Sequence, residues 1–378
     1  MKSWFIHIGT FVMLAAVAGV VVMVSGAVPI KASSGHWPIT KWVLEFSMSR
    51  SVSTHSMGIQ APPNLGDEAM VMKGAGHYES GCAPCHGSPN WTKPRVAQRL
   101  TPVPPALPAK ITNWKPEELF YIVKHGVLFT GMPAFPSQKR DDEVWGVVAF
   151  LLQFPQLDRA RYRELVDGTE AVPKADVPLA VLKSCAGCHG IAGQGRETSA
   201  FPRLGGLHVE YFVAAMQAYS TGKRHSGIME PISGRLSDDE IREIADFYTR
   251  RRDAARTPAE GDDLASAANE DKLAAIRRGE TIAQSGLPEQ EVGACIACHS
   301  AIRDEHNPNY PVLNGQFADY LVLQLSLFKQ RHRGGSEYAE LMHPIADGLK
   351  LEQMQNVAAY YASLEGNTDS IAEEADDK

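Results

Sequence analysis

The sequence has no cysteine outside three short stretches and no block of basic residues. Its 37 lysines and arginines are outnumbered by 44 acidic residues, which gives a net charge of -7. Nucleic-acid-binding domains usually carry a basic patch, so the charge argues against a nucleic-acid partner. Residues 365–378 hold six acids and one lysine, and this composition predicts a disordered acidic tail over residues 367–378.

A long stretch near the N-terminus, after Lys2, lacks charged residues. From Trp4 to Gly26 the sequence has 23 residues without a charged side chain, enough for a helix to cross a bilayer of about 30 Å. A cleaved signal peptide is the alternative, because Ser25 and Ala27 form a small-x-small cleavage site. The apolar core of a signal peptide is usually only about 7–15 residues long, so we expect an uncleaved transmembrane anchor within residues 1–30. In both cases the rest of the chain is exported.

What the sequence does contain is repetition. The three cysteine stretches are "SGCAPCHGSP" from Ser80, "KSCAGCHGIA" from Lys183 and "GACIACHSAI" from Gly293. After the second and third of them, "GGLHVEYFVAAMQAYSTGKR" aligns without a gap with "NGQFADYLVLQLSLFKQRHR". This alignment pairs Tyr211 with Tyr320 and Arg224 with Arg333. The sequence therefore predicts three tandem copies of one unit.

Each unit ends in a predicted helix, and the pattern is clearest in the second copy. Ser237 and Glu240 form a capping box. The apolar residues Ile241, Ile244, Ala245 and Tyr248 follow at the spacing of one helical face. No strand-rich pattern is present in the sequence.

The domain prediction combines these signals. It consists of the anchor over residues 1–30, an amphipathic linker over 31–65, three units over 66–165, 170–256 and 270–366, and the tail. Two aperiodic stretches, 166–178 and 253–272, are the predicted connections between units. In the amphipathic linker, Ile39, Trp42, Val43 and Phe46 have helical spacing. This helix could lie on the membrane surface, on a partner subunit or on the first unit itself.

Closely spaced cysteines serve disulfide exchange, zinc binding or covalent haem attachment. A thioredoxin-like redox site requires a βαβ unit. A structural zinc site requires four ligands, and no unit supplies a second Cys or His pair. Covalent haem accounts for every part of Cys-x-x-Cys-His, because the two sulfurs form thioethers to the ring and the adjacent histidine binds the iron. Three copies favour haem strongly over the other two readings.

The second axial ligand is predicted to be a methionine. Met132, Met229 and Met342 lie at equivalent loop positions before the last helix of each unit, 46, 40 and 43 residues after the histidine. A methionine is often core filler, but this recurrence favours thioether ligation, which raises the reduction potential. His125, His225 and His343 lie close to these methionines, yet none recurs in all three units, so surface or supporting roles are expected for them.

A third recurring feature is Pro-x-Leu at Pro105, Pro202 and Pro311. A ligating imidazole usually donates its second N–H to a carbonyl, which fixes the ring. We therefore predict that the carbonyl groups of these prolines accept a hydrogen bond from the histidines. A rigid turn without this bond is the alternative.

On these motifs the last two units resemble the dihaem cytochromes c of the c-four type. The first unit resembles a monohaem class I cytochrome c domain through "HYESGCAPCHGSP", "VKHGVLFTGMPAF" and "DDEVWGVVAFLLQFP". The resemblance implies an all-α fold of three small helical domains with one haem c each, attached after export. It implies thioethers at Cys82, Cys85, Cys185, Cys188, Cys295 and Cys298, proximal ligands at His86, His189 and His299, and distal ligands at Met132, Met229 and Met342. Ser300 stands where glycine usually follows the third histidine.

These expectations describe an electron carrier without a catalytic residue or a small-molecule substrate, because six-coordinate iron leaves no open site. The expected location is the bacterial inner membrane, with the haem domains in the periplasm. The donor would be a quinol-oxidising complex or a dehydrogenase and the acceptor a terminal oxidase, with the respiratory complex as the redox partner. Two alternatives stay open: a cytochrome subunit of a larger oxidoreductase, and a peroxidase-type haem enzyme with one accessible iron.

Overall fold

The computed structural model describes residues 2–28, 31–167, 176–251, 267–299 and 307–364. Within these ranges the regular structure is helical, and the only β-type contact is an isolated bridge between Leu287 and Val292. The all-α prediction is therefore confirmed. The predicted acidic tail lies outside the described residues.

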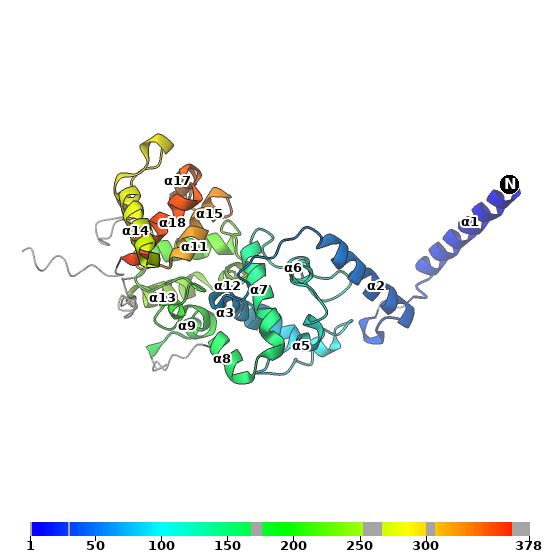
Figure 1. The fold of residues 1–378 in the computed structure, drawn as a ribbon. Coiled ribbons are helices and arrows are strands. Elements are labelled where there is room, and N and C mark those ends of the chain that lie inside the picture. The colour runs from blue at the N-terminus through cyan, green and yellow to red at the C-terminus, as the bar shows by residue number, and fades with distance from the viewer. Residues whose placement is uncertain (1, 29–30, 168–175, 252–266, 300–306, 365–378) are drawn as a thin grey trace, which may run out of the picture.

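Two helices precede the first unit. Helix α1 (Lys2–Val24) projects away from the rest of the chain, and α2 (Pro38–His55) lies between α1 and the folded body (Figure 1). Among the described residues, Trp4–Val24 is the one helical stretch whose length and composition would allow it to cross a membrane, a test that a signal sequence also passes. The side chains from Trp4 to Val24 are exposed.

The second half of α2 packs on the first unit. Val52 is buried, and the hydroxyl of Ser53 donates to Oε1 of Glu118 at 2.8 Å. His55 stacks on Tyr121 with ring centroids 5.7 Å apart. One of the three placements considered for the amphipathic linker is thus correct for this half of the helix.

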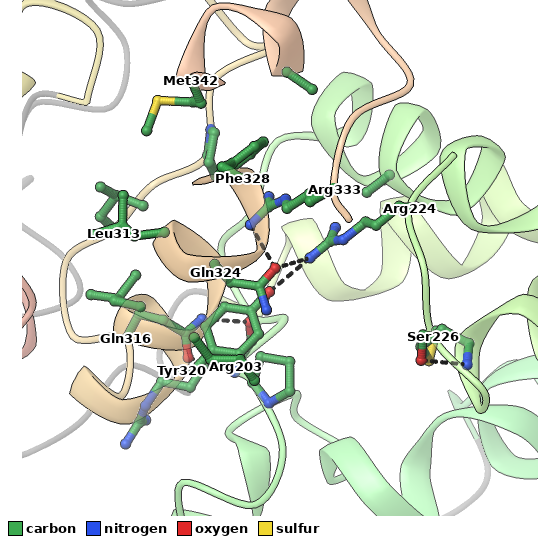
Figure 2. Close-up of a pocket in the computed structure, with 18 of the residues that line it drawn as sticks. Arg203, Arg224, Ser226, Leu313, Gln316, Tyr320, Gln324, Phe328, Arg333 and Met342 are labelled. Atoms are coloured by element: carbon green, nitrogen blue, oxygen red, sulfur yellow. Dashed lines mark hydrogen bonds between the residues drawn. The ribbon is translucent and has the colours of Figure 1, made fainter. Parts of the chain in front are cut away.

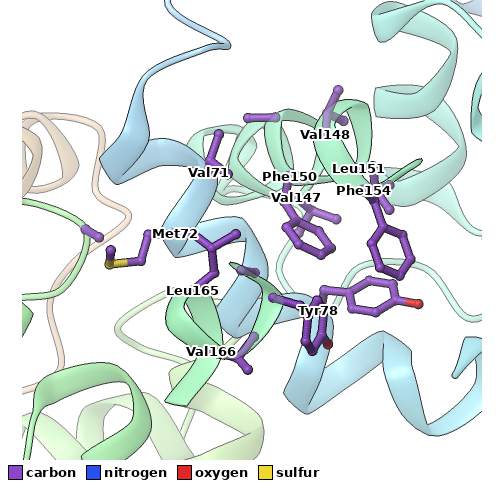
Figure 3. Close-up of a cluster of buried hydrophobic side chains, with 14 of the residues drawn as sticks. Val71, Met72, Tyr78, Val147, Val148, Phe150, Leu151, Phe154, Leu165 and Val166 are labelled. Atoms are coloured by element: carbon purple, nitrogen blue, oxygen red, sulfur yellow. The ribbon is translucent and has the colours of Figure 1, made fainter. Parts of the chain in front are cut away.

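The first unit contains six α-helices: α3 (Glu68–His77), α4 (Ala83–His86), α5 (Leu107–Ile111), α6 (Pro116–His125), α7 (Asp141–Gln153) and α8 (Arg159–Asp167). The crossing of α3 and α7 is close because two glycines meet there. A Cβ atom on Gly74 would lie only 1.9 Å from the carbonyl oxygen of Gly146. Around this crossing, Val71, Tyr78, Phe150 and other apolar side chains form the first core (Figure 3).

The second unit contains α9 (Leu179–Ser184), α10 (Ala186–His189), α11 (Val209–Ser220), α12 (Met229–Ser233) and α13 (Asp238–Thr249). The predicted last helix is confirmed as α13. Ser237 caps it and forms the capping box with Glu240, and Ile241, Ile244 and Tyr248 are buried.

The third unit contains α14 (Ala267–Ser285), α15 (Ala318–Lys329), α16 (Glu337–Glu340), α17 (Met342–Gly348) and α18 (Leu351–Ser363). It repeats the glycine-mediated crossing of the first unit, because a Cβ on Gly279 of α14 would lie 1.9 Å from the carbonyl oxygen of Asn356 in α18. The predicted connections between units include residues that belong to helices. Val166 is buried in α8, and residues 267–272 already belong to α14.

Candidate haem-binding sites

The Cys-x-x-Cys-His stretches form single turns. In the first two units the first cysteine caps a short helix that contains the second cysteine and ends at the histidine, α4 after Cys82 and α10 after Cys185. In the third unit Cys295–Ala297 form one turn of 3₁₀ helix directly before Cys298. The spacing therefore places each cysteine pair and its histidine on one short turn, as covalent haem attachment requires.

The histidines share one hydrogen bond. Nδ1 of His86 lies 3.1 Å from the carbonyl oxygen of Pro105, and Nδ1 of His189 and of His299 lie 3.0 Å from those of Pro202 and Pro311. The predicted histidine–proline contact is confirmed in all three units. A carbonyl oxygen only accepts, so Nδ1 carries the proton and the neutral ring keeps its lone pair on Nε2. This is the tautomer that a metal-binding imidazole needs.

Burial also favours the neutral ring. It lowers the pKa of His86 and of His189 below the ordinary value, although the proline carbonyl opposes the shift. Both rings are thus uncharged at neutral pH.

Each turn is held by a buried tyrosine, which the sequence analysis missed. The hydroxyl of Tyr78 donates to the carbonyl of Gly87 at 2.6 Å, and that of Tyr248 to the carbonyl of Gly190 at 3.1 Å. In the third unit Tyr361 donates to the carbonyl of His299 itself at 3.1 Å. Tyr248 and Tyr361 come from the last helix of their units, whereas Tyr78 follows α3. Of these three tyrosines, only Tyr248 and Tyr361 occupy equivalent positions when the sequences of the last helices are aligned.

The cysteine thiols are unlike those of a redox site. Burial raises the pKa of Cys82 and of Cys185 to about 12, and that of Cys188 and of Cys295 to about 11. Thiols that exchange disulfides have lowered values and react as thiolates. These environments therefore disfavour thiol–disulfide chemistry.

The methionines lie near the predicted positions, with one correction. Met132 lies in the loop between α6 and α7. Met229 and Met342, predicted in loops, are instead the first residues of the short helices α12 and α17. The backbone at the start of a helix takes part in the hydrogen bonds of that helix. The backbone positions of these two methionines are therefore more restricted than those of loop residues.

One cavity of about 1010 Å³ brings the predicted residues of the last two units together. It is lined by Cys185, Cys188, His189, Met229, Cys295, Cys298, His299 and Met342, besides apolar side chains. Pockets for single organic ligands usually measure about 300–1,000 Å³. The cavity is at the upper end of that range, as expected of a space shared by two sites.

Two buried arginines line this cavity and connect the units (Figure 2). Arg224 donates to the hydroxyl of Tyr320 and to Oε1 of Gln324, both at 3.0 Å. Arg333 donates to the same Oε1 at 2.7 Å, and it also donates to the hydroxyl of Tyr211 at 2.8 Å. Each arginine thus contacts the tyrosine of the other unit. The residues that the sequence alignment pairs therefore meet where the second and third units contact each other.

The arginines also show that the residues present fit haem. The hydrogen-bond partners described above are neutral, whereas buried charges are normally balanced by opposite charges. Haem carries two carboxylates, which would supply negative charge inside the cavity. The apolar lining, the histidine tautomer and this positive charge together suit that group.

The neighbouring histidines have other partners. His343 contacts the carbonyl oxygen of Arg333 at 2.8 Å and Oε2 of Glu340 at 2.9 Å. Nε2 of His225 lies 3.2 Å from Nζ of Lys139 in the first unit. These contacts agree with the expected surface or supporting roles of His343 and His225.

The first and second units are in close contact. A Cβ atom on Gly76 of α3 would lie 3.1 Å from Sγ of Cys188 and 3.2 Å from the ring of Phe201. The first core also includes Phe201. Helix α3 therefore packs against the second Cys-x-x-Cys-His turn at Cys188.

Comparison with known proteins agrees with these features. Residues 69–151 match the family model described as cytochrome c oxidase, cbb3-type, subunit III, and residues 179–248 match that of cytochrome c. A thiosulfate dehydrogenase electron acceptor of Thiomonas intermedia is 31% identical over 180 residues, 48% of this chain and 78% of that protein. Cytochrome c-552 of Acidithiobacillus ferridurans is 30% identical over 200 residues, 51% of this chain and 80% of that protein. The solved cytochrome c4 of Acidithiobacillus ferrooxidans is 28% identical and covers 48% of this chain and 99% of its own, with a TM-score of 0.39.

Proposed function

Because this chain belongs to the cytochrome c family and is an electron carrier, we propose that it carries three haem c groups and delivers electrons at the periplasmic face of the inner membrane. The observation that supports three groups is the threefold recurrence of one arrangement. In every unit a histidine directly after a cysteine pair donates Nδ1–H to a proline carbonyl at 3.0–3.1 Å.

The residues of each unit have distinct roles in this proposal. When bound, haem supplies an iron that changes valence. The two cysteines hold the group covalently, and the histidine binds the iron through Nε2. The methionine completes the coordination, which closes the site to substrates and favours electron transfer over catalysis.

The number of haems and the ligands are testable in the purified protein. We expect intact mass to show three covalent haem additions, and a Cys295→Ala/Cys298→Ala variant to show two. Met229→Ala should lower one reduction potential and leave the other two in place. Three unchanged potentials would refute the ligand assignment, and two haems in the wild-type chain would refute the third site.

The alternative of a peroxidase-type enzyme requires one iron with an exchangeable ligand. Carbon monoxide tests this directly, because it binds quickly to reduced iron only where a ligand is weak or missing. We expect slow binding at every haem of the wild-type protein and fast binding at one haem after Met229→Ala.

The membrane location is supported by α1 and by the first half of α2. Trp37, Ile39, Trp42 and Phe46 are each more than half exposed, and tryptophan is enriched where proteins meet the bilayer surface. We propose that α1 anchors the chain and that this face of α2 rests on the membrane. N-terminal sequencing of the mature protein tests the anchor, because cleavage after Ala27 would remove it. Brominated lipids should quench less fluorescence after Trp42→Phe than in the wild type if α2 touches lipid.

Redox partners are proposed from the relatives. Two relatives, 29–31% identical to this chain, are electron acceptors of a thiosulfate dehydrogenase, so a dehydrogenase is a suitable donor and a terminal oxidase a suitable acceptor. A cytochrome subunit of a larger oxidoreductase is the second candidate, because residues 69–151 match an oxidase subunit family. Mild detergent extraction followed by size analysis separates the two: co-migration with other subunits favours the second.

A further inference from the structure

The junction between the first and second units contains a buried carboxylate that reaches the segment before Met229. Glu143 lies in the first turn of α7 and is 2% exposed. Its Oε1 accepts from the hydroxyl of Ser226 at 2.7 Å, and its Oε2 accepts from the backbone N–H of Gly227 at 2.6 Å. Both oxygens of a first-unit side chain therefore bind the second unit.

Ser226 transmits this contact to Met229. Its hydroxyl oxygen accepts from the N–H of Met229 at 3.1 Å and from that of Ile228 at 3.3 Å, while its proton goes to Glu143. These N–H groups lie at the start of α12, where the helix itself offers no acceptor. Ser226 thus fixes the position of the first residue of α12, and Glu143 fixes Ser226.

Arg140 strengthens the same junction. Its guanidinium is 2.8 Å from Oε1 of Glu143 and donates to the carbonyl of His225 at 2.8 Å. Asp142 pairs with Arg140 at 2.8 Å and with Lys73 at 3.1 Å. The two acids and two bases balance, so the buried carboxylate is compensated by charge and by hydrogen bonds.

The first unit shows how differently such a methionine can be held. There the N–H of Met132 donates to the hydroxyl of Thr130 at 3.0 Å, and that hydroxyl donates to the carbonyl of Val127 at 2.7 Å. The first unit thus holds its methionine with residues of its own loop. In the second unit a hydroxyl oxygen, that of Ser226, likewise accepts from the N–H of the methionine. There, however, the hydroxyl donates to Glu143 of the first unit.

We propose that Glu143 is a positioning residue for Met229, so that the first unit completes the distal side of the second haem site. This inference rests on the proposed function, because it requires Met229 to be the distal ligand. It makes the second site dependent on the docking of the first unit, whereas the first site depends on its own loop.

The test uses the full haem-loaded chain with Glu143→Ala, Ser226→Ala and Met229→Ala variants. The readouts are the charge-transfer absorption of methionine-ligated ferric haem and a potentiometric titration. Glu143→Ala and Ser226→Ala should weaken the absorption and lower the same single potential that Met229→Ala lowers. Adding Glu143→Ala to Met229→Ala should produce no further shift of that potential, since a positioning residue acts only through the ligand.

Two further variants separate positioning from general effects. Asp141→Asn removes a carboxylate from the same helical turn, where Asp141 pairs with Lys124 at 2.6 Å within the first unit, and should leave all potentials in place. Glu143→Gln keeps an oxygen for the N–H of Gly227 and should restore part of the absorption lost in Glu143→Ala.

The outcomes distinguish a failure of the ligand assignment of Met229 from a failure of the positioning role of Glu143. If Met229→Ala leaves the absorption and potentials unchanged, the ligand assignment and the proposed function fail. If Met229→Ala acts but Ser226→Ala and Glu143→Ala do not, the ligand assignment stands and the positioning role is wrong. Ser226→Ala decides the matter even if Glu143→Ala fails to fold, because it leaves the charges of the junction intact.

Discussion

The crossing of α3 and α7 should tolerate alanine on one helix and not on the other. A Cβ on Gly74 would lie 1.9 Å from the carbonyl oxygen of Gly146 and 2.8 Å from Cβ of Phe150. Real Cβ atoms essentially never approach another atom closer than 3.0 Å, so the two backbones would have to separate by about 1.1 Å. A Cβ on Gly146 meets its nearest atom, the carbonyl oxygen of Met70, at an ordinary 3.6 Å.

The expected energies follow from these distances. Overpacking a core costs about 1–3 kcal/mol, and since both atoms of the worst contact belong to rigid helices, Gly74→Ala should be at the upper end. Gly146→Ala should be neutral or gain about 0.5–1 kcal/mol from helix propensity. The free energy of unfolding can be followed by circular dichroism in denaturant, with limited proteolysis to identify the first unit as the part that opens, because a chain of several units need not unfold in one step. Equal stability of the two variants would refute the packing argument.

Three other substitutions test buried contacts in the three units. Tyr248→Phe removes the hydrogen bond to the carbonyl of Gly190 and should cost about 1–2 kcal/mol in the unfolding free energy; an unchanged denaturation midpoint would contradict the proposed support of the turn. Burial lowers the pKa of His77 well below its ordinary value. Below about pH 6.5 the unfolded chain therefore binds a proton that the folded chain rejects, and stability should fall by up to about 1.4 kcal/mol per pH unit as pH decreases. His77→Phe should flatten that slope, and identical slopes would show that another group is responsible. Gln316→Ala removes two hydrogen bonds to the backbone of Arg203, at 3.0 and 3.1 Å, and should speed hydrogen exchange at that amide about tenfold; unchanged exchange would mean that these bonds do not hold the second and third units together.

Local patterns in the sequence predicted local structure well. Ser237, Glu240 and the apolar stripe of α13 act within one helix, so the pattern contains all the information needed. The histidine–proline hydrogen bonds were also predictable, because metal-binding imidazoles have a known requirement and the prolines recur.

Contacts between units could not be predicted in the same way. Glu143 and Ser226 are 83 residues apart, and neither local pattern indicates that the two side chains meet. The sequence alignment of Arg224 with Arg333 and of Tyr211 with Tyr320 gives equivalence and no distance, so it did not reveal that each arginine contacts the tyrosine of the other unit. The start of α12 at Met229 depends on such a contact, through Ser226 and Glu143, and this is why the sequence suggested a loop there.

The closeness of Gly76 to Cys188 sets an order for biosynthesis. Under the proposed function, an enzyme would join Cys188 to haem, and α3 packs beside that sulfur once the first and second units have closed. We therefore expect the second unit to be loaded while its neighbour is still undocked. Maturation of this chain is then a sequence of attachment followed by assembly, and a chain that closed too early would keep an empty second site.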